Sequence, residues 1–149
     1  MMDSRVVWVV DTSILVTHLR SGIYNRFITG GLRNRSIFLP GVVLCELFAG
    51  AVTRNDRSDL EAFRRALGPH LLPTAVDDWV LAGRCLARYS SRWGRILPRD
   101  HLADALIAVT ASKFNARLAT ENLTHMVRWQ WVLRKLGRSV GISRISPDR

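Results

Sequence analysis

Four acidic residues lie in apolar segments of this sequence, where burying a carboxylate is costly unless donors or a positive charge compensate it. Asp11 directly follows a β-branched, apolar run near the start of the chain. Glu46 has only apolar residues or glycine three and four positions away, which are its neighbours on a helix. Asp104 lies in a segment that is apolar nearly all round, and Asp100 precedes it by one helical turn on the same face. A helix cap or an ion pair with an arginine explains each acid singly, whereas a shared cation explains several together.

The segments around these acids predict an α/β domain with a mostly parallel central sheet. Strands are expected at residues 6–10, 36–39, 70–73, 117–120 and 140–145, and helices at 14–19, 40–52 and 99–114. Short strands that alternate with helices indicate parallel pairing. Ligands of such sheets bind at the carboxyl ends of the strands. Asp11, Glu46 and Asp104, called the three acids below, are therefore expected to meet at one edge of the sheet.

Two further helices are predicted from sequences that resemble capping boxes, Ser58-x-x-Glu61 and Thr74-x-x-Asp77. The first helix would carry Leu60, Phe63 and Leu67 on one face. The apolar face expected for the second consists of Val76, Trp79, Val80, Gly83, Leu86 and Ala87.

Length and charge restrict the class of protein. The 149 residues suit a single domain, expected over 1–149, and 22 basic against 12 acidic side chains give a net charge of +10. This excess favours an anionic partner, either a nucleic acid or an acidic protein. The first residues contain no apolar segment long enough for a signal peptide or a membrane span, so we expect a cytoplasmic protein. Cys45 and Cys85 form no Cys-x-x-Cys pair and are expected to be buried, reduced thiols.

The chemistry that these residues favour is phosphodiester hydrolysis. Clustered carboxylates are relieved by cations, and oxygen-only ligands suit Mg²⁺ or Mn²⁺. Such a cation beside a basic surface is typical of nucleases. A dehalogenase-type phosphatase would need a second aspartate two residues after Asp11, where the sequence has Ser13. P-loop, G-x-S-x-G and H-E-x-x-H patterns are missing from the sequence.

Four motifs occur in a characteristic order: Asp11-Thr-Ser-Ile-Leu, Leu39-Pro-x3-Leu-Cys-Glu46-Leu-x-Ala-Gly50, Asp104-Ala-Leu-Ile-Ala-x-Thr-Ala111 and Leu118-Ala-Thr-x-Asn122. Together they resemble PIN domains, and most of all the VapC toxins of bacterial toxin–antitoxin modules. The likeness runs from about residue 6 to residue 126. It implies a PIN-like three-layer sandwich, with a central sheet of four to five strands and helices on both faces. It also implies a metal-dependent ribonuclease that acts as a growth-inhibiting toxin.

The resemblance implies a role for each matching residue. Asp11, Glu46 and Asp104 match the family's catalytic and metal-binding acids, which bind Mg²⁺ or Mn²⁺. Ser13 and Asn122 match polar positions that support these acids.

His125 stands where the family pattern has a fourth acid. Imidazole suits Mn²⁺ better than Mg²⁺, so this difference favours one tightly held ion over two. Asp100 either substitutes for the missing carboxylate or accepts an arginine. An alternative function follows from the same difference, namely a catalytically weakened PIN-like module that binds RNA.

Arg84, Arg88 and Arg92, called the arginine stripe below, repeat every four residues, and Arg95 and Arg99 continue toward Asp100. They are candidate contacts to the RNA backbone, or simply a solvated helix face. The resemblance further implies a VapB-type antitoxin partner and a homodimer.

An extra helix is expected around residues 126–136, before the last strand. Its Trp129 and Trp131 could stack on bases, although packing in a core or interface is the more frequent role of tryptophan at such positions.

Overall fold

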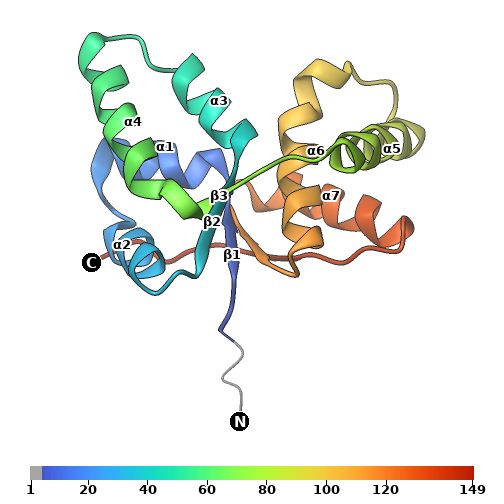
Figure 1. The fold of residues 1–149 in the computed structure, drawn as a ribbon. Helices are drawn as coiled ribbons and strands as arrows, with labels where there is room; N and C mark the ends of the chain where they lie inside the picture. Colours follow the sequence, from blue (N-terminus) through green and yellow to red (C-terminus); the bar gives the residue numbers. More distant parts are fainter. Residues whose placement is uncertain (1–4) are drawn as a thin grey trace.

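The computed structural model describes residues 5–149, which fold around one parallel sheet (Figure 1). Its strands are β1 (Trp8–Val10), β2 (Ile37–Pro40), β3 (Leu71–Leu72), β4 (Arg117–Ala119) and β5 (Gly141–Ser143). They lie in the order β3-β2-β1-β4-β5, and each neighbouring pair is parallel. The predicted α/β class and the five strand positions are confirmed.

Helices cover both faces of this sheet. On one side in Figure 1 lie α1 (Thr12–Ser21), α2 (Asn25–Arg33), α3 (Gly41–Ala49) and α4 (Arg54–Leu67). On the other lie α5 (Val76–Trp93), α6 (Pro98–Lys113) and α7 (Leu123–Lys135). The result is the expected three-layer sandwich. Helix α2 was not predicted, because Gly30 and Gly31 weaken the helical pattern there.

The core explains why Asp11 and Asp104 lie in apolar parts of the sequence. In β1 and β4, Val9, Val10, Leu118 and Ala119 are fully buried, as expected for central strands covered on both faces. Residues 105–111 of α6 are all buried as well. Asp11 and Asp104 adjoin these buried segments, so the same packing that forms the core fixes their backbone positions.

Both predicted capping boxes are wrong, because each helix begins at a different residue from the one expected. Helix α4 begins earlier, where the Thr53 hydroxyl accepts from the Asp56 amide (3.0 Å) and the Asp56 carboxylate accepts from the Thr53 amide (2.9 Å). Helix α5 begins one residue later than expected, and the Asp78 carboxylate accepts from the Ala75 amide at 2.7 Å.

The predicted apolar face of α5 is also largely wrong. Val76, Trp79 and Val80 are exposed, whereas the helix buries Asp78, Ala82, Cys85, Leu86 and Tyr89. The buried Asp78 carboxylate caps the helix and accepts from Lys113 Nζ of α6 at 3.1 Å, which fixes the rotation of α5. The predicted face of α4 is correct, since Leu60 and Leu67 are buried and Phe63 packs against the core.

Cys85 is buried as expected, and burial raises the pKa of its thiol to about 11. Cys45 is exposed, contrary to expectation, because it lies on the outer side of α3. Between residues 5 and 149, no helix combines the length and apolar character needed to cross a bilayer.

Candidate active site

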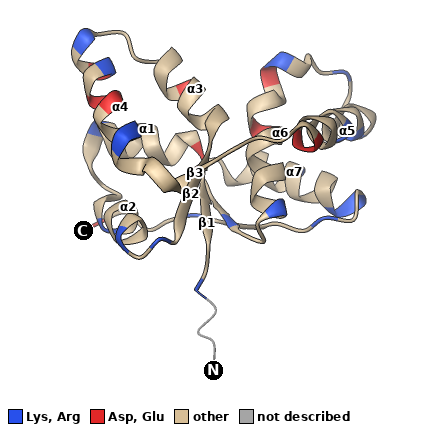
Figure 2. Cartoon of the chain, in the orientation of Figure 1, with Lys and Arg blue, Asp and Glu red and all other residues tan. Residues whose placement is uncertain are grey.

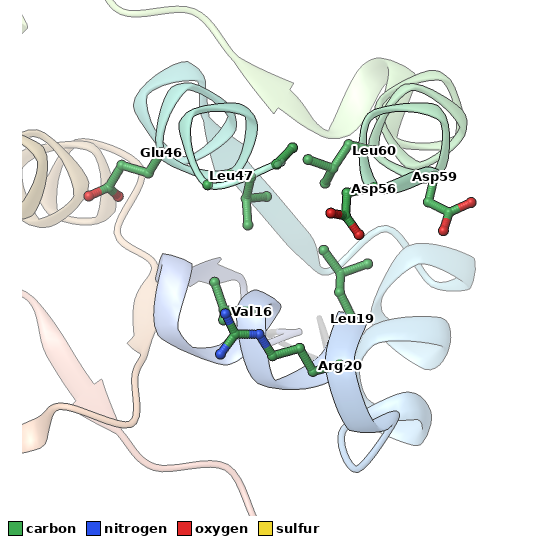
Figure 3. A pocket seen from close by; sticks show the side chains of 10 residues that line it. Val16, Leu19, Arg20, Glu46, Leu47, Asp56, Asp59 and Leu60 are labelled. Atoms are coloured by element: carbon green, nitrogen blue, oxygen red, sulfur yellow. The ribbon is translucent and has the colours of Figure 1, made fainter. Parts of the chain in front are cut away.

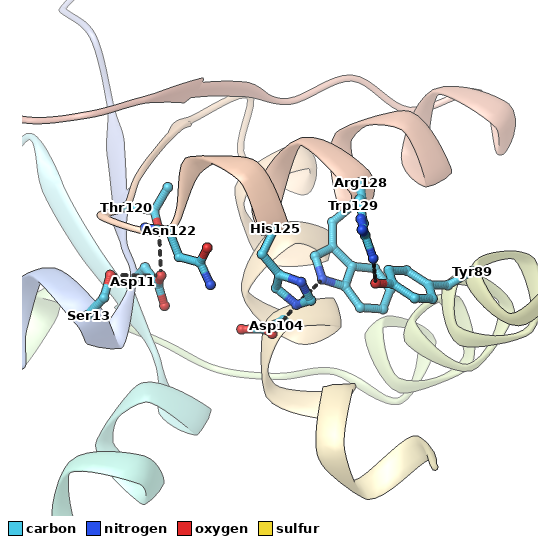
Figure 4. A network of polar contacts seen from close by, with 9 residues as sticks. All are labelled: Asp11, Ser13, Tyr89, Asp104, Thr120, Asn122, His125, Arg128 and Trp129. Atoms are coloured by element: carbon cyan, nitrogen blue, oxygen red, sulfur yellow. Dashed lines mark hydrogen bonds and ion pairs between the residues drawn. The ribbon is translucent and has the colours of Figure 1, made fainter. Parts of the chain in front are cut away.

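Asp11 lies at the carboxyl end of β1, where its backbone amide donates to the Ala119 carbonyl of β4 at 2.9 Å. The residue is only 5% exposed. Although it precedes α1, its carboxylate makes no capping hydrogen bond to that helix within the described chain. Two hydroxyls hold it instead: Ser13 Oγ (3.0 Å) and Thr120 Oγ1 (2.7 Å) both donate to Asp11 Oδ2 (Figure 4).

Burial raises the pKa of the Asp11 carboxyl, and the negative charge of Asp104 raises it further. The hydrogen bonds from Thr120 and Ser13 oppose this rise. A carboxylate that is both buried and close to another acid is one that a bound cation would stabilise.

Glu46 reaches the same region from α3, where it accepts a hydrogen bond from the Thr12 hydroxyl. Glu46 is exposed as a residue, but partial burial of its carboxyl raises the pKa of that group, and the charges of Asp104 and Asp11 add to the effect. Asp104 therefore lies close enough to raise the pKa of both other acids, and Asp11 close enough to raise that of Glu46.

Asp104 enters from α6, and its Oδ2 lies 2.8 Å from His125 Nε2 at the start of α7. Across residues 5–149, no lysine or arginine forms an ion pair with any of the three acids. Ion pairs with arginine therefore do not explain why these acids occur in apolar segments.

The most compact group of possible metal ligands differs from the one expected. His101, Asp104 and His125 offer ligand atoms that all lie within 4.8 Å of one another, and this is the single such group in the part of the chain described. Asp11 and Glu46 are not part of this group. Asp104 therefore belongs to two sets, the three acids and a histidine group that the sequence reasoning missed.

Other candidate residues take different positions. Asp100 is exposed and forms an ion pair with its neighbour Arg99, with 3.6 Å between Asp100 Oδ1 and Arg99 Nε. It does not belong to the compact group. The Asn122 side chain lies between Asp11 and His125 in Figure 4, and its backbone amide donates to Thr120 Oγ1 at 3.0 Å. Glu121 faces away from the three acids and accepts from Thr17 and Tyr24.

All three residues of the arginine stripe are exposed on α5, as are Arg95 and Arg99 beyond it. The guanidinium of Arg88 lies over the Trp131 ring (5.8 Å), and that of Arg92 lies over both Trp93 and Trp131 (5.9 Å each). Trp129 is fully buried, so it packs in the core and does not present a face for bases.

The hydroxyls of Thr12 and Thr120 were also missed by the sequence reasoning. Thr120 directly follows β4 and Thr12 is the first residue of α1, in the motifs that begin at Leu118 and Asp11. The sequence does contain one indication that His101 lies near Asp104, because it stands three residues before Asp104 on the same helix face.

Residues 8–125 match the family model described as the PIN domain. The chain belongs to the PIN domain family. Its fold is similar to a chain of VapBC2 from Rickettsia felis bound to a promoter DNA fragment, with 20% identity, coverage of 94% of this chain and 99% of the other, and a TM-score of 0.70. DNA-bound VapBC from Salmonella typhimurium is also similar, with 17% identity, 93% and 98% coverage and a TM-score of 0.67.

VapBC-1 from nontypeable Haemophilus influenzae shows 18% identity, 93% and 97% coverage and a TM-score of 0.66. At these identities the likeness establishes the fold. A comparison with curated protein sequences finds no significant match.

Proposed function

We propose that this PIN domain is a metal-dependent endoribonuclease of the VapC toxin type. The observation that carries the proposal is that the negative charge of Asp104 raises the pKa of both Asp11 and Glu46, while no lysine or arginine in residues 5–149 forms an ion pair with any of the three acids. Oxygen donors of this kind fit Mg²⁺ or Mn²⁺.

The chain's own residues would prepare the site for hydrolysis. The hydroxyls of Ser13 and Thr120 fix the Asp11 carboxylate, and that of Thr12 fixes Glu46. When bound, a divalent cation supplies Lewis acidity toward the phosphodiester and makes water a better nucleophile. We expect cleavage to leave a 5′ phosphate and a 3′ hydroxyl.

The arginine stripe would attract the RNA backbone, because its charges are exposed and unpaired with carboxylates within the described chain. The same excess of positive charge, shown in Figure 2, would also suit an acidic segment of a partner protein.

The partner we propose is a VapB-type antitoxin, since structural neighbours of this chain are VapBC complexes. A pocket of about 260 Å³ lies between α1, α3 and α4 next to Glu46 (Figure 3). Leu19, Leu47 and Leu60 provide apolar walls, and Asp56 and Asp59 add two negative charges against the single positive charge of Arg20. A segment with apolar side chains and an arginine directed toward Glu46 would fit this lining. A homodimer is part of the same proposal.

The test is cleavage of RNA by purified protein with and without Mg²⁺ or Mn²⁺, with Asp104→Asn beside the wild type. We expect metal-dependent cleavage by the wild type and none by the variant, while circular dichroism shows the same fold. RNA binding without cleavage by either protein would instead support the binding module. Equal cleavage by both would refute the role of Asp104.

A further inference from the structure

The histidine group (His101, Asp104 and His125) lies beside the three acids but has a different chemistry. His101 and Asp104 stand three residues apart on one face of α6, and His125 approaches from the first turn of α7. The side chains of Asp104 and His125 are 28% and 22% exposed, so the group is partly buried but still accessible to solvent. This combination of access and partial burial is what an ion-binding site requires.

His125 Nε2 lies close to two polar neighbours, 2.8 Å from Asp104 Oδ2 and 3.3 Å from the indole Nε1 of Trp129 (Figure 4). An indole nitrogen can only donate, so Nε2 accepts from Trp129 when it is unprotonated and donates to Asp104 when it is protonated. Either a proton or a metal ion on Nε2 would pair with the Asp104 carboxylate.

His101 provides an independent observation. Its Nδ1 is buried and has no hydrogen-bond partner within residues 5–149. Its ring stacks on Tyr89 (5.4 Å between centroids) and on His125 (5.6 Å), with the two imidazole planes inclined at 30°. His101 is thus an imidazole held by its neighbours, with one ring nitrogen that makes no hydrogen bond among the described residues, as suits a metal ligand.

We propose that His101, Asp104 and His125 bind a first-row transition-metal ion such as Mn²⁺ or Zn²⁺. Two imidazoles and one carboxylate are ligands that these ions accept and that Mg²⁺ disfavours. The site rests on the proposed nuclease function only in that it shares Asp104 with the three acids. Its consequence for that function is selectivity, because it would favour transition ions over Mg²⁺ at this end of the active site.

The test is a titration of metal-free protein with Co²⁺, whose visible absorption bands report nitrogen ligands, and with Zn²⁺ by calorimetry. Wild-type protein should bind one ion in competition with a large excess of Mg²⁺. His101→Gln and His125→Gln should each weaken binding by at least about tenfold, since even indirect partners of metal ligands have effects of that size. His18→Gln is the matched control, because the His18 Nδ1 is likewise buried and unpartnered within residues 5–149 but lies outside the group.

Two results would overturn the proposal: unchanged Co²⁺ affinity in the double variant His101→Gln/His125→Gln, or displacement of Co²⁺ by an equal concentration of Mg²⁺. If a variant unfolds, paramagnetic effects of Co²⁺ on the wild-type imidazole NMR signals decide instead. They should affect His101 and His125 before His18 and His70, and equal effects on all four would contradict the site.

Asp11→Asn separates this proposal from the nuclease function. It should abolish RNA cleavage and leave the Co²⁺ absorption bands unchanged. Loss of those bands in Asp11→Asn would show that the ion binds to the three acids rather than to the histidine group.

Discussion

Replacing Thr120 by valine tests how the proposed active site holds its buried carboxylate. The Thr120 side chain is fully buried, and its hydroxyl donates to Asp11 Oδ2 at 2.7 Å. Valine keeps the shape of threonine but removes this donor. A hydrogen bond to a charged group contributes about 1.5–3 kcal/mol, so the affinity for Mn²⁺ should fall about tenfold to a hundredfold. The concentration of Mn²⁺ that gives half-maximal RNA cleavage should rise by the same factor.

The assay is a Mn²⁺ titration of cleavage and of direct binding by calorimetry. Thr110→Val is the matched control, because Thr110 is also buried but its hydroxyl donates to the Leu106 carbonyl within α6. It should lower stability without changing the Mn²⁺ titration. In the Asp11→Asn background, Thr120→Val should have no further effect on metal binding. A Thr120→Val titration identical to that of the wild type would refute the view that this hydroxyl positions Asp11.

Three further predictions concern charge and burial. Because burial raises the pKa of Asp11, its ionisation destabilises the metal-free fold, and the loss of stability grows as the pH rises through that raised pKa. Urea unfolding in EDTA should therefore show Asp11→Asn more stable than wild type at neutral pH, with the difference vanishing below the ordinary aspartate pKa; a larger difference in acid would contradict this. Changing the arginine stripe to glutamine should weaken RNA binding and reduce the slope of log affinity against log salt by about 2, if each arginine contacts one phosphate of single-stranded RNA. The control variant replaces three exposed arginines of α4 by glutamine and so has the same net charge; they are Arg54, Arg64 and Arg65. An equal change of slope in this control would show that only net charge matters. A thiol reagent at neutral pH should modify exposed Cys45 rapidly and buried Cys85 slowly, because the Cys85 pKa is about 11; Cys45→Ser should remove the fast phase.

Much of this fold could be predicted because its strands are short, apolar and separated by clear helical patterns. The carboxyl-end rule for parallel sheets then predicted that Asp11 lies at the sheet edge, where the charge of Asp104 acts on both Asp11 and Glu46. The rotation of α5 could not be predicted, since the buried Asp78 that fixes it is a polar residue held by Lys113 of another helix. Periodicity alone favours the apolar Val76 and Val80, which are in fact exposed.

The histidine group shows a similar limit. His125 was visible as a departure from the family pattern, but its partner His101 depends on how α6 and α7 pack. Thr12 was likewise not expected to hold Glu46, because the two residues belong to different elements. Contacts across elements are set by tertiary packing, which local sequence patterns do not contain.

The most direct test of the central claim is to map new 5′ ends in cellular RNA after expression of the wild-type protein and of Asp11→Asn at equal levels. If the three acids form a nuclease site, discrete new 5′-phosphate ends will appear with the wild type and be absent with the variant. The same ends at the same abundance in both would contradict the assignment.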